Sequence, residues 1–443
     1  MDRSLLMPWG AGARRIRLVF AAIAAALSCV VLPLSPSPAR ADGPGAGSPW
    51  AVSVGDSYIS GEAGRWAGNT DIDKSNYSTI DALKSKAYYD NPEETEELIP
   101  GCHRSKSAEI HIAGLSGENL ACSGAKTSSF TASDGYFKPG LDFYESGTNE
   151  GQALMLLKFA RTHNVKLVAI SIGGNNFDFA GVVQSCVEAF LFDENCSSDE
   201  KVLEHFEPPN ISKQTAAIQG AIVNVAKAMS AAGYSNSQYT IAVQDYPSPI
   251  PEGEGFRYQG KYERLLTGKC GFSNEDAKWA NTEALPAIDE AIFNAAEKTG
   301  LPNIEQLQLS SAFNGRRLCE KGVGLLEEEG LSLWQSPEAV DKTEWINQIH
   351  VFTFGTPFEI QEDLHPNYWG QLALRNCLTQ VYNAGSPRSG ACAISGKGLN
   401  AEGLPNMALK PARPLVVHRR HAKPHRKKRR RSHRRRGRSH ARL

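Results

Sequence analysis

The chain has 443 residues, of which 41% are hydrophobic, so it has enough apolar side chains for a globular core and is not a fully disordered protein. Its formal net charge at pH 7 is zero, but this sum hides a separation of charge. Residues 42–410 contain 28 basic and 47 acidic side chains, whereas residues 411–443 contain 15 basic and no acidic side chains. The body of the chain and its C-terminal end therefore need separate explanations.

The first 41 residues are typical of a secretory signal peptide. Three arginines within residues 14–17 precede an apolar run over residues 18–34, and residues 39–41 read Ala-Arg-Ala, which suits cleavage. The apolar run is short for a transmembrane helix and ends in prolines, so we expect cleavage and secretion rather than anchoring. A flexible lead-in rich in Gly, Pro and Ser follows at residues 42–49, and then one folded domain over residues 50–395.

The domain begins with a predicted buried strand at residues 50–54, where apolar and β-branched side chains dominate. Gly55 ends this strand, and Ser57 lies where a strand-to-helix turn would expose its hydroxyl. The polar stretch over residues 65–100 has no clean period and is expected to be a long loop over one end of the sheet. We expect its large apolar side chains to pack the loop down rather than to line an acyl pocket; these are Tyr88, Tyr89, Leu98 and Ile99.

Further along the chain, helical and strand-like patterns alternate. Helices are predicted over residues 151–164, 211–233, 282–299 and 368–382, and strands over residues 165–172, 239–244 and 304–309. This alternation is typical of a parallel sheet that is covered by helices on both faces. Ligands of such sheets bind outside the carboxyl ends of the strands.

Four short motifs follow one another in the chain. They are Gly-Asp-Ser at residues 55–57, Ala-Cys-Ser-Gly-Ala at 121–125, Ser-Ile-Gly-Gly-Asn-Asn at 171–176 and Glu-Asp-Leu-His-Pro at 362–366. Together they resemble the four blocks of the SGNH (GDSL) hydrolases, and in particular the secreted, disulfide-containing bacterial esterases and lipases. The resemblance covers about residues 48–384. It implies a three-layer α/β/α, flavodoxin-like fold with a central parallel sheet of about five strands.

The resemblance also implies roles for individual residues. Ser57 would be the nucleophile, which needs a base to take its proton, and His365 would be that base. The backbone N–H groups of Ser57 and Gly124 and the side-chain amide of Asn175 would bind the oxyanion. Asp56 is expected to support the turn rather than to act in the chemistry. Neither a metal ion nor an organic cofactor is expected.

Two positions depart from the usual motifs. Asn176 stands where the third motif usually has Asp, which leaves Asn175 unchanged. In the fourth motif Glu362 occupies the position of the triad acid, with Asp363 beside it. Either acid, or a backbone carbonyl, can orient His365, and the Glu-x-x-His spacing favours Glu362 as the third catalytic residue.

Nine cysteines are present, and removal of Cys29 with the signal peptide leaves eight. An even number of cysteines in an exported protein predicts disulfides, and no Cys/His cluster in the sequence has zinc-site spacing. We hypothesise sequential pairing and export before oxidation. The expected pairs are Cys102 with Cys122, Cys186 with Cys196, Cys270 with Cys319, and Cys377 with Cys392.

The sequence thus predicts a monomeric, secreted serine esterase or lipase that acts on carboxylic esters, with lipid acyl esters as the expected substrates. A carbohydrate acetyl esterase is the alternative on the same scaffold. A non-catalytic surface-binding protein is the alternative from another class. The histidines outside the fourth motif, such as His103 and His111, receive no functional role.

Residues 396–443 are expected to be a linker and a disordered tail rich in Arg, Lys and His. The charge density of residues 411–443 suits an anionic cell-wall polymer, a phospholipid surface, nucleic acid or the acidic body itself. Because export is expected, a polyanion at the cell envelope is the preferred partner, and nucleic acid is not. The tail would then retain the secreted protein at the envelope.

Overall fold

The computed structural model of the chain describes residues 43–71, 77–350 and 357–412. The predicted signal peptide and the basic tail from residue 413 onward lie outside the described residues. Contacts along the chain group the described residues into one compact unit. Within the described residues, no helix has the length and apolar character needed to cross a bilayer.

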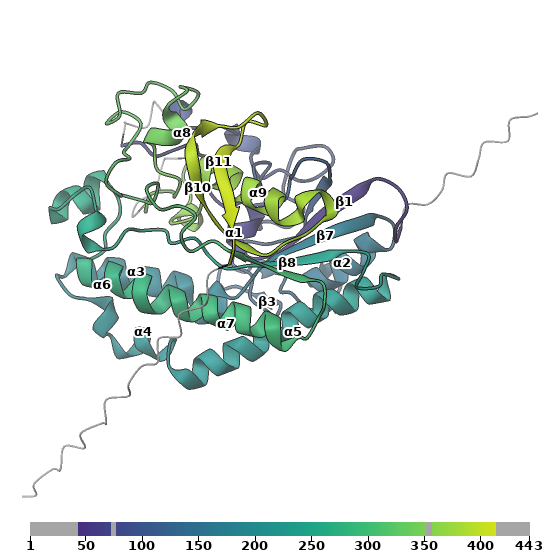
Figure 1. Cartoon of the computed structure of the whole chain (residues 1–443). Helices are drawn as coiled ribbons and strands as arrows, with labels where there is room; N and C mark the ends of the chain where they lie inside the picture. Colours follow the sequence, from purple (N-terminus) through teal and green to yellow (C-terminus); the bar gives the residue numbers. More distant parts are fainter. Residues whose placement is uncertain (1–42, 72–76, 351–356, 413–443) are drawn as a thin grey trace, which may run out of the picture. The chain divides into compact units, whose positions relative to one another are not determined.

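A seven-stranded sheet forms the centre of this unit (Figure 1). Its strands are β1 (Pro49–Gly55), β2 (Ser116–Asn119), β7 (Asn164–Ser171), β8 (Thr240–Gln244), β9 (Ile304–Gln308), β10 (Gly390–Leu399) and β11 (Pro405–Lys410). The strand order is β11-β10-β9-β8-β7-β1-β2, and every neighbouring pair is parallel except β10 and β11. The five strands from β2 to β9 therefore have the 2-1-3-4-5 order of flavodoxin-like sheets. Two small hairpins lie outside the sheet: β3 (Phe130–Thr131) pairs with β4 (Phe137–Lys138), and β5 (Glu145–Ser146) pairs with β6 (Asn149–Glu150).

Helices cover both faces of the sheet. The α-helices are α1 (Ser57–Ser60), α2 (Gln152–Ala160), α3 (Phe179–Leu191), α4 (Glu200–Glu204), α5 (Pro208–Ala231), α6 (Asn274–Trp279), α7 (Leu285–Lys298), α8 (Ala339–Lys342) and α9 (Tyr368–Tyr382). Figure 1 shows α2, α5 and α7 along one face and α9 along the other. The three-layer α/β/α architecture expected from the sequence is therefore present.

Shorter helical turns connect these elements. The 3-10 turns are η1 (Tyr77–Thr79), η2 (Lys84–Lys86), η3 (Gly174–Phe177), η4 (Cys196–Ser198), η5 (Gly253–Gly255), η8 (Ile360–Glu362) and η9 (Asn383–Gly385). The π-helical turns are η6 (Glu263–Thr267) and η7 (Ala280–Ala284). Between residues 65 and 100, the described part is mostly irregular, as expected for a long loop. Within it Tyr88 is buried and Ile99 packs on the core, whereas Leu98 is exposed.

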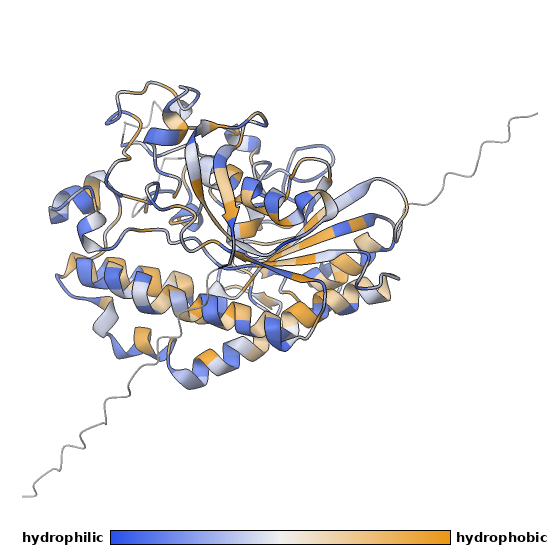
Figure 2. Ribbon diagram, in the orientation of Figure 1, coloured by the Kyte–Doolittle hydropathy of each residue, from blue (hydrophilic) through white to orange (hydrophobic). Residues whose placement is uncertain are grey.

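The core of the domain is built around strands that are apolar along most of their length. All five residues of β8 are buried, and seven of the eight residues of β7 are buried, as is usual for parallel strands covered on both faces. Figure 2 shows hydrophobic residues concentrated in these central strands and hydrophilic residues on the outer sides of the helices. The carboxyl ends of β1 and β7 lie side by side, because Gly55 pairs with Ser171. Two of the four sequence motifs therefore meet at this end of the sheet.

Two expectations about the fold need correction. The sheet has seven strands rather than about five, because β10 and β11 extend it beyond β9. The same two strands continue the folded domain past residue 395, where the sequence placed its end, as far as Lys410. Their sequences contain Gly and Lys at positions that weaken the strand signal, which explains the error.

Four disulfides join the cysteines in the sequential order expected. They link Cys102 to Cys122, Cys186 to Cys196, Cys270 to Cys319, and Cys377 to Cys392. The first holds the loop before Ser123 to the segment at residue 102, and the last joins α9 to β10.

Candidate active site

The turn after β1 presents Ser57 at the start of α1. The Asp56 backbone N–H donates to the Ser171 carbonyl over 2.8 Å, which ties the turn to the end of β7. Gln152 braces the same turn, because its side chain accepts from the Gly55 N–H and donates to the Gly55 carbonyl. The nucleophile candidate is thus held by backbone contacts on two sides.

Gly55 is required at this turn for two reasons. Its φ is +140°, a value that side chains with a Cβ rarely adopt. An added Cβ would also lie 1.9 Å from the Ser171 carbonyl oxygen, so any other residue would push β1 and β7 apart.

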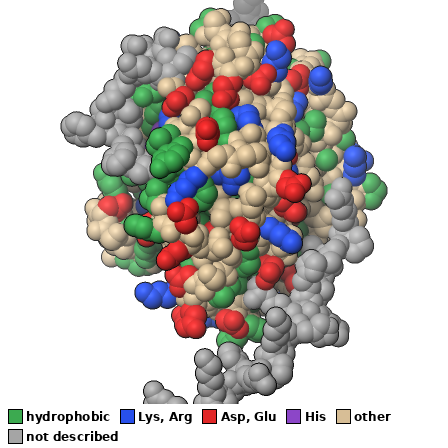
Figure 3. Space-filling view, turned by 90° about the vertical axis from the view of Figure 1, so that its left-hand side faces the viewer, with side chains coloured by type: hydrophobic (Ala, Val, Ile, Leu, Met, Phe, Trp, Pro, Cys, Tyr) green, Lys and Arg blue, Asp and Glu red, His purple; other side chains and the backbone are tan. Residues whose placement is uncertain are grey.

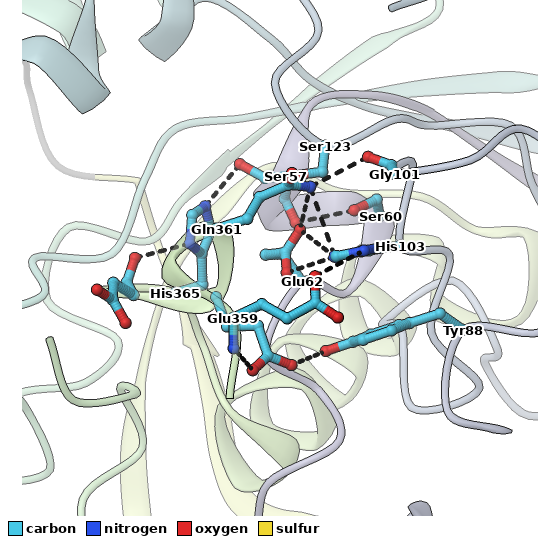
Figure 4. A network of polar contacts seen from close by, with 12 residues as sticks. Ser57, Ser60, Glu62, Tyr88, Gly101, His103, Ser123, Glu359, Gln361 and His365 are labelled. Carbon is cyan, nitrogen blue, oxygen red and sulfur yellow. Dashed lines mark hydrogen bonds and ion pairs between the residues drawn. The ribbon is translucent and has the colours of Figure 1, made fainter. Parts of the chain in front are cut away.

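The structure brings Ser57 and His365 together across 308 positions of sequence. The Ser57 Oγ and the His365 Nε2 lie 2.7 Å apart, and both side chains are buried (Figure 4). The His365 Nδ1 lies 2.9 Å from the backbone carbonyl oxygen of Asp363. Because a carbonyl oxygen only accepts, Nδ1 carries the proton and Nε2 is free to accept the serine hydroxyl. This is the arrangement that a serine nucleophile and its general base require.

The expectation that Glu362 orients His365 is wrong for this structure. The Glu362 carboxylate is buried and accepts from the Trp66 indole N–H at 2.8 Å and the Tyr88 hydroxyl at 2.5 Å. The carboxylate of Asp363 is also occupied elsewhere, because it accepts from the backbone N–H of His350 and lies 2.8 Å from its Nδ1. The backbone carbonyl, which the sequence left open as an alternative, takes the position of the third triad member. Chain direction at Leu364, where φ is +62°, turns this carbonyl toward the ring.

Burial lowers the pKa of His365, and the nearby negative charge of Glu62 opposes this effect. The net direction is downward from the usual histidine value, so the imidazole is neutral at neutral pH. A neutral imidazole is the form that can accept the serine proton.

The loops with the candidate oxyanion donors meet beside Ser57. The Asn175 amide donates to the Ala125 carbonyl over 3.0 Å, which links the third motif to the second. Among the described residues, its second amide hydrogen has no other acceptor. The Cys122 N–H donates to the Gly55 carbonyl over 3.1 Å, which links the second motif to the first. Ser57 and Asn175 line one cavity, whereas Gly124 is not among the described residues that line it. The oxyanion role of Gly124 therefore stays a prediction.

Asp56 and Asn176 have supporting contacts. The Asp56 carboxyl accepts from the Tyr246 hydroxyl, and this hydroxyl in turn accepts from the Gly174 N–H at 2.9 Å. Burial raises the pKa of Asp56 to about 7, although hydrogen bonds from Tyr246 and Tyr58 lower it. Asn176 uses its oxygen to accept from the Thr127 N–H and therefore braces the second-motif loop. These contacts fit the supporting role expected for Asp56.

An apolar cavity adjoins the cavity at Ser57. The two cavities share Phe179, Pro249, Leu285 and Ile288 as wall residues. The adjoining cavity has a volume of about 70 Å³. It lies between α3 and the α6–α7 segment, and its walls include the rings of Phe206, Phe272 and Trp279.

Sequence reasoning missed a group of residues beside the site, namely Glu62, His103 and Gln361. His103 is buried with its Nδ1 2.8 Å from a Glu62 oxygen, and Gln361 donates to the other Glu62 oxygen over 3.0 Å (Figure 4). The contact joins residues 41 positions apart. The only signal in the sequence was the run Cys-His-Arg-Ser at residues 102–105, which gave no indication of a partner.

The solved structures that are similar to this chain include two at 17% sequence identity. One is an extracellular lipase from Streptomyces rimosus, with a TM-score of 0.36, and the other is a phospholipase A1 from Streptomyces albidoflavus NA297, with a TM-score of 0.38. Each match covers 76% of this chain and 99% of the other chain. No protein-family model and no curated protein sequence matches the chain.

Proposed function

We propose that the protein is a secreted serine hydrolase of carboxylic esters with medium or long acyl chains. The observation that carries this proposal is the 2.7 Å contact between the Ser57 hydroxyl and the His365 Nε2. The neighbouring amide of Asn175 and the adjoining apolar cavity add the two further requirements of an acyl esterase. Four disulfides and the signal-like N-terminus support export.

The proposed reaction has two halves. Ser57 Oγ attacks the ester carbonyl carbon while His365 Nε2 takes its proton, and the resulting oxyanion accepts hydrogen bonds from the Ser57 N–H, the Gly124 N–H and the Asn175 amide. The C–O bond to the alcohol then breaks, and His365 returns the proton to the leaving alcohol. Water, deprotonated by His365, attacks the acyl-enzyme and releases the carboxylic acid and free Ser57.

The adjoining cavity supports an acyl chain rather than an acetyl group as the substrate. Its lining is almost entirely apolar, and burial of each methylene group stabilises a complex by about 0.8 kcal/mol. Because Phe179 and Leu285 line both cavities, we propose that an acyl group attached to Ser57 points from one cavity toward the other.

Hydrolysis of p-nitrophenyl esters from acetate to palmitate by the purified protein and Ser57→Ala tests this function. We expect a preference for acyl chains longer than acetyl, and a loss of roughly 10⁴-fold or more in kcat for Ser57→Ala. Highest activity on acetate and on acetylated sugars would favour the acetyl-esterase alternative. Absent activity, or activity that Ser57→Ala retains, would favour a non-catalytic binding protein.

A substitution that fills the apolar cavity distinguishes the binding of long acyl chains from the chemical step. Ala284 is buried and lines this cavity, so Ala284→Trp should reduce activity on long-chain esters while leaving activity on acetate. Ala216, an exposed residue of α5, provides the matched control, and Ala216→Trp should leave both activities unchanged. Equal loss on all chain lengths in a folded Ala284→Trp protein would show that acyl chains do not use this cavity.

A further inference from the structure

A buried polar group centred on Glu62 and His103 lies beside the Ser57–His365 contact. It contains more ionisable side chains than a purely structural role requires. Glu62 is fully buried, and its carboxylate oxygens lie 2.8 and 3.0 Å from the His103 Nδ1. On its other side, the His103 Nε2 lies 3.5 Å from Glu97 and 3.6 Å from Glu359. Tyr88 stacks on the His103 ring, with centroids 4.4 Å apart. Three carboxylates therefore surround a single buried imidazole.

This group connects three of the loops that carry candidate catalytic residues, namely those of Ser57, Gly124 and His365. The Glu62 N–H donates to the carbonyl of Ser57 over 3.1 Å, so Glu62 belongs to the nucleophile turn. His103 follows Cys102, whose disulfide and carbonyl hold the loop of Ser123. Gln361, four residues before the proposed base, donates to Glu62 and to the Gly101 carbonyl, each over 3.0 Å. Figure 4 shows these side chains converging beside the Ser57–His365 contact.

The dyad itself has no carboxylate within hydrogen-bonding distance among the described residues. The Asp363 carbonyl fixes the tautomer of His365, but it is neutral. When His365 takes the serine proton it becomes a buried cation, and a buried cation is costly without a neighbouring negative charge. The carboxylates at positions 362 and 363 are already hydrogen-bonded to other side chains.

We propose that the Glu62–His103 pair is a positioning unit of this active site: it holds the loops of Ser57, Gly124 and His365 together, and the Glu62 carboxylate supplies the negative charge that the Asp363 carbonyl lacks. This inference rests on the proposed function. Glu62 acts through His365 and does not contact the reacting atoms.

The electrostatics agree with this geometry. Burial alone would raise the pKa of Glu62, but the positive charge and hydrogen bond of His103 and the charge of His365 lower it to about 2. Burial alone would lower the pKa of His103, but Glu62, Glu97 and Glu359 raise it to about 9. The pair is therefore ionised through the neutral range. Burial has the largest effect on His365 and lowers its pKa, Glu62 raises this pKa, and the charge of His103 lowers it by a smaller amount. The other ionisable groups that face the pair are Tyr88, Lys138 and Glu362.

The decisive variant is Glu62→Gln, which removes the charge but keeps the size and an acceptor oxygen. We expect kcat on p-nitrophenyl butyrate to fall about tenfold, with KM changed less than about twofold, because the charge acts on the transition state. Since Glu62 raises the pKa of His365, its loss should also move the acid limb of kcat/KM to lower pH. Glu62→Asp retains the charge and should keep the acid limb at the wild-type position.

Glu94→Gln is the matched control. It removes a carboxylate from the exposed ion pair with Lys106, in the segment around His103. It should leave kcat, KM and the pH profile unchanged. A folded Glu62→Gln protein whose pH profile superimposes on that of the wild type would overturn the proposal, as would a loss confined to KM.

A second measurement does not depend on activity or on a stable variant. The ¹⁵N chemical shifts of the imidazoles in the wild-type protein report the protonation of each histidine, and His103 should stay doubly protonated at pH 7.5. A neutral His103 at that pH would overturn the proposal even if no Glu62 variant folds. Full activity of Ser57→Ala would instead refute the proposed function, so the two failures can be told apart.

Discussion

At the scale of single residues, the ring of His365 contacts the neutral backbone carbonyl of Asp363, where a catalytic triad would have a carboxylate. Leu364 has a φ of +62°, and its own carbonyl accepts from the Tyr58 hydroxyl over 2.9 Å. This contact fixes the backbone just before His365 and therefore the direction of the Asp363 carbonyl. The ring of His365, the proposed base, is therefore oriented by backbone geometry that is held by α1, rather than by a carboxylate.

Asp363→Asn distinguishes the two kinds of orientation. Because the side chain of Asp363 contacts His350 and only its carbonyl contacts His365, we expect kcat to remain within about tenfold of wild type. In a protease triad, replacement of the orienting Asp by Asn lowers kcat by about 10⁴-fold. Steady-state kinetics on p-nitrophenyl butyrate provide the measurement, and a loss approaching that of the protease would contradict the carbonyl assignment.

Asn175→Ala tests the oxyanion donor. Loss of one such donor should lower kcat by about 10²–10³-fold with little change in KM, because the amide acts on charge that develops only in the transition state. Asn176 provides the comparison, since its side chain contacts Thr127 and Gln214 rather than the cavity at Ser57. We expect Asn176→Ala to lower the midpoint of thermal unfolding more than it lowers kcat. Equal losses of kcat in the two variants would refute the assignment of Asn175.

At the scale of elements, the sequence predicted those units that have a strong local pattern. The helix expected at residues 368–382 matches α9, and the strand expected at residues 304–309 matches β9 to within one residue. The helix expected from residue 282 begins instead as a π-turn, and α7 starts at Leu285. The hairpin of β10 and β11 was missed, because a strand with three glycines among ten residues owes its place to pairing with β9 and β11 and not to its own propensity.

The same limit applies to the candidate site. The order of the motifs was sufficient to predict that Ser57, Asn175 and His365 lie at one end of the sheet, because the carboxyl ends of parallel strands are adjacent. It did not identify the Asp363 carbonyl as the partner of His365, since the residue type at position 364 does not reveal the backbone conformation there. It also did not identify Glu62 and His103, whose contact spans 41 positions and exists only in the folded chain.

Truncation tests the corrected domain boundary. A chain that ends at residue 395 loses β11 and the last four residues of β10, together with the buried side chains of Leu404 and Met407. It also loses the bond from the Asn376 amide to the Pro405 carbonyl, so we expect loss of cooperative unfolding and of activity. A chain that ends at residue 412 keeps all of these contacts. Circular dichroism melting curves should show a wild-type transition for the longer chain only.

At the scale of the whole molecule, buried ionisable groups link stability to pH. Burial is the main reason that the pKa of Asp56 and of Glu362 rises to about 7 and that of Glu109 to about 8. The folded chain therefore holds protons that the unfolded chain has released, and stability falls as the pH rises toward these values. The raised pKa of His103 acts in the same direction, because its favourable charge is lost between the unfolded value of 6.5 and about 9.

We therefore expect the midpoint of thermal unfolding to fall between about pH 6.5 and about pH 8.5. The opposing groups are His111, whose pKa burial lowers to about 4, and His365, whose pKa burial also lowers. Their contributions are already complete above pH 6.5 and do not offset the fall. Differential scanning calorimetry across this range provides the measurement. His103→Gln removes one of the titrating groups and should make the dependence on pH shallower. A midpoint that rises with pH in this range would contradict the charge states assigned to the interior.

The C-terminal 33 residues differ from the folded domain in their charge. On the face shown in Figure 3, acidic and basic side chains are interspersed, so no single-signed patch dominates it. The excess of acidic side chains over residues 42–410 nevertheless repels polyanions, whereas the 15 basic side chains of residues 411–443, which include no acid, attract them.

Binding of the full chain to vesicles that contain anionic lipid should therefore be strong at about 50 mM salt and weak at about 500 mM, where the screening length falls to a few ångströms. The chain that ends at residue 412 should bind neither anionic nor neutral vesicles, yet hydrolyse soluble esters at the wild-type rate. Equal vesicle binding by both chains would place the attraction in the folded domain and remove the proposed role of the tail in retention at the cell envelope.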